Sequence, residues 1–409
     1  MTVSSTSTGA DGFARQLRPR FASPRTTLVV TVPVLTLALT GLLVHLHGYH
    51  IDLEVYRLGV QTWLAGGDMY GSLPPTISGL ALPFIYPPFA AMVLTPLVVL
   101  PWTASWIALF VSSLACLAVT LYVVARRAWP AGGPGGALSV ASAALPLALA
   151  LEPVLETFEF GQVNLILMAL VAVDCLVEKP RWPRGLLVGI AAAIKLTPAA
   201  FVLFFLLRRD MRAAVVAAVT GAAATGLGFL VDAESSARYW FGGPASGVSG
   251  SVFYTNETIQ AVLARLGMDG AALTAVWLVA TAGLLALILP VVRRADPALA
   301  LIAVAGFALL VSPTSWSHHW VWIAPALVVT VGHALRLRSV GWAAVTAVLL
   351  VTFYLAPFRF LPHNDGRELT WSGFQQTVGA TYVIVALALV VVGWWHYGRR
   401  RPEREPSAA

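Results

Sequence analysis

Hydrophobic residues in this chain gather into long runs that are separated by short polar segments. Most runs approach the roughly twenty apolar residues that one helix needs to cross a membrane, so the pattern predicts an all-α, polytopic membrane protein with about twelve transmembrane helices. The runs span residues 27–47, 84–101, 102–125, 137–151, 161–177, 185–207, 212–231, 271–292, 298–311, 319–334, 340–356 and 378–396.

The composition supports the same class of protein. Hydrophobic residues make up 58% of the chain and charged residues 11%, and the mean hydropathy is +0.78. Soluble domains have about 45–50% apolar and about 25% charged residues, so soluble globular, fibrous and disordered proteins are excluded. Cys116 and Cys175 both lie in apolar runs, which argues against a disulfide framework.

The chain is basic, with 26 Lys and Arg against 19 Asp and Glu. Its arginines stand in short groups between apolar runs, which is how membrane orientation is encoded, so we expect no nucleic-acid partner. The arginine-bearing tails, 1–26 and 397–409, are expected to be cytoplasmic, the first of them disordered. The segment between them, 27–396, is expected to be one membrane domain that begins with a retained helix rather than a cleaved leader.

Charge placement is inconsistent in the first half of the chain. Counting back from the C-terminus puts the basic residues near 208–212, 293–294 and 336–338 inside, and the segments 232–270, 312–318 and 357–377 outside. Simple alternation then puts Arg126, Arg127 and the basic stretch 178–184 outside. One of two runs must break the alternation: 137–151, which is short, or 185–207, which is interrupted at Lys195 to Pro198 and reads as two half-helices.

Polar residues that interrupt or border the apolar runs are candidates for a functional site, because an ionisable group in a membrane is costly. Asp52 follows the first run, and Tyr56, four residues later, shares its helical face. A solvated acidic turn is the alternative. Lys195 suits a phosphate, because an ammonium acts as a point charge for anions. Its alternative is a lysine that reaches the membrane interface.

Further candidates come from three short polar motifs. His318 and His319 are adjacent, and neighbouring helical side chains point about 100° apart, so we expect contacts with an anion or a sugar rather than a metal site. Trp316 precedes them and is also compatible with an interfacial aromatic belt. Gln162 and Asn164 enter an apolar run, where bonds between helices are the alternative. Asn256 lies in the large outer loop.

Nucleotide-binding motifs are absent from the sequence. There is no Walker A motif and no GxGxxG after a predicted strand, so any donor substrate is expected to reside in the membrane.

Several segments together resemble the polyprenol-phosphate-mannose-dependent alpha-1,2-mannosyltransferases of actinobacteria, glycosyltransferase family 87 of the GT-C superfamily. Their order and spacing carry the resemblance over residues 27–396. They are Asp52-Leu53-Glu54-Val55-Tyr56, Gly66-Gly67-Asp68-Met69-Tyr70, Tyr86-Pro87-Pro88-Phe89, Gly161-Gln162-Val163-Asn164, Lys195-Leu196-Thr197-Pro198 and Ser317-His318-His319.

The resemblance implies a GT-C fold in the cell membrane, with interfacial helices in the first outer loop and the active site on the periplasmic side. Within the family, the chain is most similar to enzymes that extend phosphatidylinositol mannosides. The donor would be beta-linked polyprenyl-phosphate-mannose, the acceptor a glycolipid and the product an alpha-mannoside.

The resemblance also maps roles onto residues. Asp52 corresponds to the catalytic base, with Tyr56 a candidate orienting partner. The remaining candidates are Lys195, His318 and His319 for the donor phosphate, and Gln162, Asn164, Asn256 and Trp316 for the sugar or acceptor. Asn256 is followed by Glu257-Thr258 where many relatives read Gln-Ser.

One carboxylate suffices for such an inverting transfer, because a phosphate leaves as a stable anion and needs no acid. The scheme requires no cofactor and no metal, although magnesium or manganese stays compatible with acidic residues near a phosphate. A secondary transporter or flippase of an anionic lipid-linked sugar is the rival interpretation.

Overall fold

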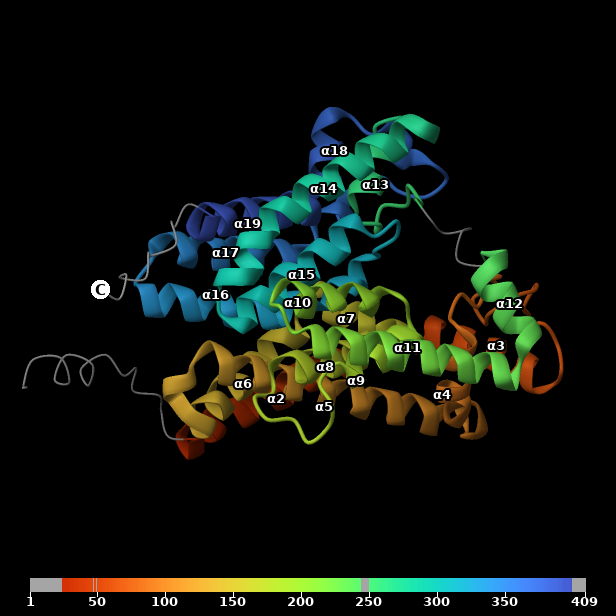
Figure 1. Ribbon diagram of the computed structural model, residues 1–409, viewed down its shortest axis with the longest axis horizontal. Helices are drawn as coiled ribbons and strands as arrows, with labels where there is room; N and C mark the ends of the chain where they lie inside the picture. The colour runs from red at the N-terminus through yellow and green to blue at the C-terminus, as the bar shows by residue number, and fades with distance from the viewer. Residues whose placement is uncertain (1–23, 47, 49, 244–249, 399–409) are drawn as a thin grey trace, which may run out of the picture.

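The computed structural model of the protein describes residues 24–46, 48, 50–243 and 250–398; most of the two predicted tails, 1–26 and 397–409, lies outside these residues. The described residues form α-helices and short 3-10 helices, and their only β-type pairing is an isolated bridge between Asn256 and Trp316. Most helices run along one direction and form a bundle (Figure 1). The prediction of an all-α membrane protein is confirmed.

Contacts between distant segments define one end of the bundle, which we call the basic end. Arg127 Nε donates to the Leu176 carbonyl oxygen at 2.6 Å, and Arg208 Nη1 donates to the Val292 carbonyl oxygen at 3.0 Å. Arg294 Nη1 donates to the Tyr397 carbonyl oxygen at 2.7 Å. The arginine groups from both halves of the sequence therefore gather at one end.

The opposite end, which we call the loop end, holds the long connections. The His50 ring stacks on Trp106, with 5.2 Å between centroids. Trp63 Nε1 donates to Asp232 Oδ2 at 2.9 Å, and an arginine, Arg359, binds Glu156 there. Residues that follow the first, seventh and eleventh apolar runs thus lie at this end.

Within the described residues the chain passes between the two ends ten times. Eight helices are long and apolar enough to cross a membrane, and the shorter α8 and α15 connect the same two ends. The even number returns the chain to the basic end, as the charge pattern predicts. The crossing helices are α2 (Pro24–His45), α5 (Trp102–Ala128), α6 (Gly133–Leu149), α8 (Asn164–Leu176), α11 (Met211–Val231), α14 (Gly270–Arg294), α15 (Pro297–Val311), α16 (Ile323–Leu337), α17 (Val340–Leu355) and α19 (Thr381–Gly398).

The predicted number of about twelve crossings is not confirmed, because two apolar runs do not carry the chain from one end of the bundle to the other. The first is α4 (Pro88–Val99), a helix of 12 residues. Both of its ends lie at the loop end: Pro88 is close to Gly228, near the end of α11, and Arg57 donates to the Leu100 carbonyl oxygen at 2.8 Å.

The second run forms a re-entrant hairpin. It consists of α9 (Leu186–Ile194), the 3-10 helix η2 (Thr197–Phe201) and α10 (Val202–Leu207). Gly185, at the start of α9, has φ +100°, and a Cβ there would lie 2.1 Å from the Ala213 carbonyl oxygen. The hairpin therefore starts beside the start of α11 and returns to it, because α10 ends four residues before α11.

The hairpin resolves the charge inconsistency. Residues 178–184 and 208–212 flank a segment that enters and leaves at the same end, so both basic stretches lie at the basic end together with Arg126 and Arg127. The interruption at Lys195 to Pro198, predicted from the sequence, is the turn of this hairpin.

Large apolar side chains point outward from the crossing helices. Leu37 is 73% exposed on α2, Val279 73% on α14 and Leu230 86% on α11. Contiguous exposed apolar surface is rare on soluble monomers, and here it fits contact with lipid chains.

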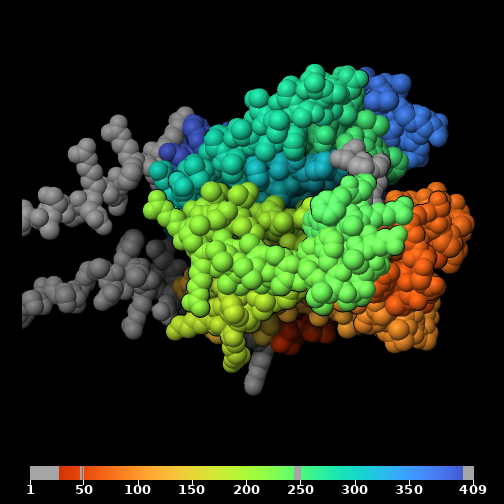
Figure 2. All heavy atoms as spheres, turned by 45° about the vertical axis from the view of Figure 1, so that its right-hand side comes forward, coloured from red at the N-terminus to blue at the C-terminus, as the bar shows by residue number. Residues whose placement is uncertain are grey.

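Short helices cover the loop end. Figure 2 shows α12 (light green) on its surface, against the orange first loop, with a hollow between α12 and the yellow-green residues around 200. The short α-helices at the loop end are α3 (Ile51–Leu64), α7 (Glu152–Phe160), α12 (Ala233–Gly242), α13 (Ile259–Arg265) and α18 (Gly373–Gly379). The 3-10 helices there are η4 (Ser317–Trp322), η5 (Pro357–Phe360) and η6 (Arg367–Thr370). A further 3-10 helix, η1 (Pro130–Gly132), lies between α5 and α6.

The re-entrant hairpin makes a prediction about sidedness. In a background without Cys116 and Cys175, single cysteines at Arg181 and Arg212 are expected to react with an impermeant maleimide from one side of the membrane, the side on which Arg293→Cys reacts. Arg367→Cys should react from the other side. Labelling of positions 181 and 212 from opposite sides would show that residues 186–207 cross the membrane.

Candidate functional site

Asp52 stands in the first turn of α3, at the loop end of the bundle. This turn packs closely on the end of α7, where Gly161 has φ +68° and a Cβ would lie 2.9 Å from Leu53 Cβ. Only glycine permits this backbone conformation and approach together without strain. The result is that Gln162, the next residue, lies beside α3.

A buried polar network connects α3, the first loop and Gln162. Tyr56 Oη donates to Gln162 Oε1 at 2.6 Å, and Gln162 Nε2 donates to Tyr86 Oη at 3.1 Å. The two tyrosine hydroxyls are 3.0 Å apart. Tyr56, the predicted partner of Asp52, thus contacts Gln162. The bond from the Tyr56 hydroxyl group fixes the orientation of the Gln162 amide.

Burial raises the pKa of Asp52 to about 6, against an opposing effect of the Lys195 charge and of Gln162 as a hydrogen-bond donor. A carboxyl group with such a pKa is largely ionised at neutral pH and still accepts a proton readily, which is the requirement for a general base.

Lys195 lies at the turn of the re-entrant hairpin. It is the C-cap of α9 in an extended conformation, φ −146° and ψ 132°, because Pro198 lacks the N–H that would continue the helix. Its Nζ donates to Asn164 Oδ1 at 3.0 Å and contacts His319 Nε2 at 3.2 Å. The ammonium also lies 5.5 Å from the Tyr86 ring centroid.

These contacts define the state of His319. An ammonium only donates, so His319 Nε2 is the acceptor and the neutral ring carries its proton on Nδ1. That Nδ1 is buried without a hydrogen-bond partner in the protein, and so is His318 Nε2. Buried polar atoms are normally satisfied, so both nitrogens are available to a polar ligand. The described residues contain no cluster of three His, Cys, Asp or Glu side chains suited to a metal.

The turn that carries the two histidines, η4, is held by α7 and α8. The His318 carbonyl oxygen accepts from Asn164 Nδ2 at 2.9 Å and from Thr157 Oγ1 at 3.1 Å. Asn164 therefore bonds both Lys195 and the histidine turn, which sets their separation.

Asn256 contacts the loop that precedes this turn, and Trp316 is the last residue of that loop. Asn256 is fully buried; its Oδ1 accepts from the Ser315 N–H at 3.0 Å and its Nδ2 donates to the Ser251 carbonyl oxygen at 2.7 Å. Because both of its polar atoms bond the protein, Asn256 holds the 312–316 loop in this structure. Trp316 is half-buried and packs edge-on against Phe253.

An ion-pair cluster that the sequence did not suggest anchors the same region. Arg359, just after α17, binds Glu156 at 2.7 Å and Glu152 at 3.3 Å, and Tyr382 Oη donates to Glu152 Oε2 at 3.0 Å. Burial raises the pKa of Glu152 to about 7. The cluster ties α7 to the last loop and to α19, and only the tertiary structure brings its members together.

A cavity of about 50 Å³ adjoins Lys195. Its polar lining residues are Lys195, Asn164, His319 and Thr197, and most of the remaining wall is apolar, including Phe201, Leu309 and Trp322. The charges of Asp52 and Lys195 influence one another, yet the two side chains form no ion pair within 4.0 Å in this described part of the chain.

The structure brings Asp52, Tyr56, Gln162, Asn164, Lys195 and His319 into one connected group. His318 adjoins it through the His319 ring, with 4.7 Å between centroids. Tyr86 was not among the predicted site residues, although its Tyr86-Pro87-Pro88-Phe89 motif was part of the resemblance.

Comparisons with known proteins give the family. Curated relatives include the polyprenol-phosphate-mannose-dependent alpha-(1-2)-phosphatidylinositol mannoside mannosyltransferase of Mycolicibacterium smegmatis, 40% identical over 84% of this chain and 83% of the relative. The protein of the same description from Mycobacterium tuberculosis is 38% identical over 87% of each chain. A phosphatidylinositol pentamannoside mannosyltransferase of M. tuberculosis is 32% identical over 87% of this chain and 84% of its own.

No solved structure matches the chain. Residues 84–313, more than half of the sequence, match the profile of glycosyltransferase family 87. The chain therefore belongs to glycosyltransferase family 87.

Proposed function

We propose that the protein transfers mannose from polyprenyl-phosphate-mannose to a phosphatidylinositol mannoside and forms an alpha-1,2 linkage. The descriptions of the relatives support this donor, acceptor and linkage. The family, the membrane-crossing helices and the cavity beside Lys195 are compatible with two lipid-borne substrates.

One observation carries the proposal: Lys195 lines a largely apolar cavity and lies close enough to Asp52 for its charge to lower the pKa of that carboxyl group. A lipid phosphate has one charged group on an apolar chain, which matches a buried cation at the polar edge of an apolar wall. The sugar would then lie between the phosphate and Asp52.

The proposed reaction is a single displacement. Asp52 takes the proton of the acceptor hydroxyl, and the acceptor oxygen forms a bond to the anomeric carbon of mannose. The bond from that carbon to the phosphate oxygen breaks, and its electron pair leaves with polyprenyl phosphate. One displacement inverts the anomeric carbon, as a beta-linked donor and an alpha-linked product require.

Lys195 and the Nδ1–H of His319 are the groups that we assign to the phosphate. Charge increases on the leaving phosphate, and fixed donors in a desolvated site stabilise such charge without reorganising. The His318 ring supplies a further nitrogen in the same place. We assign Gln162 to the orientation of Asp52, Asn164 to that of Lys195, and Asn256 with Trp316 to support of the histidine turn.

The orientation that we propose follows the distribution of arginines. Positively charged loops remain in the cytoplasm, so the basic end and both tails are assigned to the cytoplasm and the loop end to the periplasmic side. The reaction then takes place outside the cytoplasm, where a membrane-resident donor replaces a nucleotide sugar.

The overall proposal is tested with purified protein, labelled polyprenyl-phosphate-mannose and phosphatidylinositol mannosides of increasing mannose number. Labelled glycolipid of higher mannose number is expected. Movement of the donor across proteoliposomes without any product would instead favour the transporter interpretation.

Replacing the base tests the role of Asp52. Asp52→Asn is expected to lower the rate of transfer by at least about 100-fold, the usual contribution of a general base, with donor binding retained. Glu54→Gln is the matched control, because Glu54 lies on the same turn but accepts from the Ile77 N–H, a bond that glutamine keeps. Near-normal transfer by Asp52→Asn would reject the assignment.

The raised pKa of Asp52 predicts the pH dependence. The base acts when ionised, so kcat/KM should rise with pH through about 6 and fall to about one tenth of its plateau one pH unit lower. A pH profile of initial rates measures this. A rate that is constant between pH 5 and 7 contradicts an Asp52 base with this pKa.

Removing the cation tests the phosphate site. Lys195→Met should raise the KM for the donor about 10- to 100-fold, the worth of a hydrogen bond to a charged group. Asn164→Ala should have a smaller effect in the same direction, because Asn164 acts through Lys195 and the histidine turn. If the KM for the donor is unchanged in Lys195→Met, this lysine does not belong to the site. The internal control is the KM for the acceptor, which should stay unchanged in both variants.

A further inference from the structure

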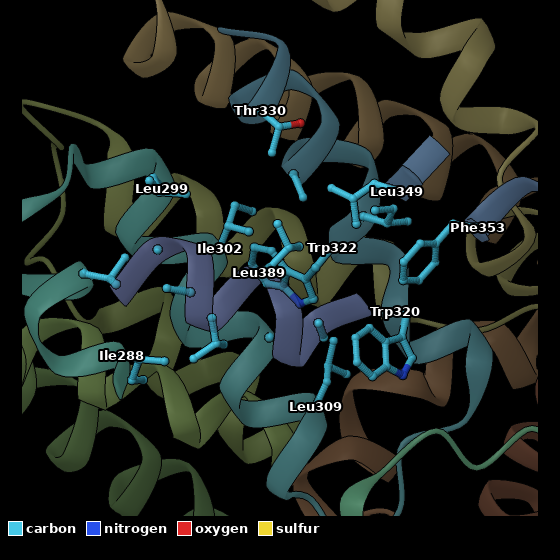
Figure 3. A pocket seen from close by; sticks show the side chains of 18 of the residues that line it. Ile288, Leu299, Ile302, Leu309, Trp320, Trp322, Thr330, Leu349, Phe353 and Leu389 are labelled. Carbon is cyan, nitrogen blue, oxygen red and sulfur yellow. The ribbon is translucent and has the colours of Figure 1, made fainter. Parts of the chain in front are cut away.

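A second apolar cavity, of about 90 Å³, lies among α14, α15, α16, α17 and α19. In Figure 3 the side chains of Ile288, Leu299, Leu349, Phe353 and Leu389 surround it, and Thr330 is the one labelled side chain that carries a hydroxyl. That hydroxyl bonds the Leu327 carbonyl oxygen. Trp320 also lines the cavity, and its Nε1 is buried without a hydrogen-bond partner in the protein. The rest of the lining is predominantly apolar, which favours an apolar ligand.

This interior cavity adjoins the cavity beside Lys195. Trp322 and Leu309 line both of them, so these two side chains form their common wall. Trp322 belongs to η4, the 3-10 helix that carries His318 and His319. The candidate phosphate site and the interior cavity are therefore neighbours, separated by these two side chains.

The occupant follows from spacing. In polyprenyl-phosphate-mannose the apolar chain begins directly at the phosphate, so isoprene units bound near Lys195 lie within reach of the interior cavity. In a phosphatidylinositol mannoside, inositol and mannose residues separate the reacting hydroxyl from the acyl chains. A cavity that starts at the phosphate site therefore suits the donor chain and not the acceptor.

We propose that the interior cavity binds isoprene units of the donor beyond the first, and that the chain passes between Trp322 and Leu309 from the cavity beside Lys195. This inference rests on the proposed function. It assigns discrimination by chain length to α15 and α19, which are remote from Asp52.

Gly306 provides a direct test. It lies on α15 and lines the interior cavity, and a Cβ built on it meets nothing within 4 Å. Gly306→Ala, →Val and →Leu therefore fill the cavity in steps without displacing a neighbour at the first carbon. Gly283→Leu is the matched control: Gly283 lies inside α14, its Cβ position is equally open, and it faces outward.

The measurement is the KM for donors with one isoprene unit and with seven or more. The Gly306 series should raise the KM of the long-chain donor, roughly tenfold for every two methylene groups excluded, and leave that of the one-unit donor unchanged. Gly283→Leu should change neither. Equal KM increases for both donors, or none for the long one, would overturn the proposal.

A second measurement is independent of activity and of the Gly306 variants. Polyprenyl phosphate with a diazirine on its second isoprene unit should label residues of α15 or α19 in the wild-type protein. Excess unlabelled polyprenyl phosphate should suppress this labelling, and phosphatidylglycerol should not. Equal suppression by both lipids would identify an ordinary lipid site and reject the proposal.

The two proposals fail separately. If the wild-type protein transfers mannose from no polyprenyl donor, the proposed function fails. If it transfers from long and short donors alike and the labelled residues lie elsewhere, only the interior cavity loses its assignment.

Discussion

The structure depends on how a half-buried ammonium group, that of Lys195, is kept charged in an apolar bundle. A lysine at the centre of a membrane helix costs about 2.5–3.5 kcal/mol, and the cost falls only when partners replace water. Asn164, His319 and the face of the Tyr86 ring supply those partners. Each comes from a different part of the chain, so the lysine couples the hairpin, α8, the histidine turn and the first loop.

Support for the site extends outward in layers of satisfied polar groups. Asn164 bonds both the lysine and the His318 carbonyl oxygen, Asn256 bonds the preceding loop, and Arg359 ties α7 to the last loop. A buried pair is expensive to break once formed, so these bonds favour one arrangement over others. In the proposed reaction this rigidity keeps Asp52 and Lys195 apart, at a separation that substrate can fill.

The sequence predicted the class of fold and named several of the polar side chains that the structure groups around Lys195, and the misses have physical causes. Apolar periodicity located every long helix, and Pro198 marked the hairpin turn, but run length alone does not separate a crossing helix from α4 or from a hairpin. Costly residues such as Asp52 and Lys195 stood out against apolar neighbours. Arg359 was not recognisable in this way, because a charged residue in a predicted outer loop has no desolvation cost until the fold buries its partners.

The two proposals assign different roles to the halves of the chain. The N-terminal half supplies the base and the lysine, and the C-terminal half holds the lipid chain. The most direct test is a cryo-electron microscopy structure of the Asp52→Asn variant with polyprenyl-phosphate-mannose. The account predicts phosphate density within hydrogen-bond distance of Lys195 Nζ, with mannose directed at residue 52. Phosphate density away from Lys195, or a sugar facing away from residue 52, would contradict it.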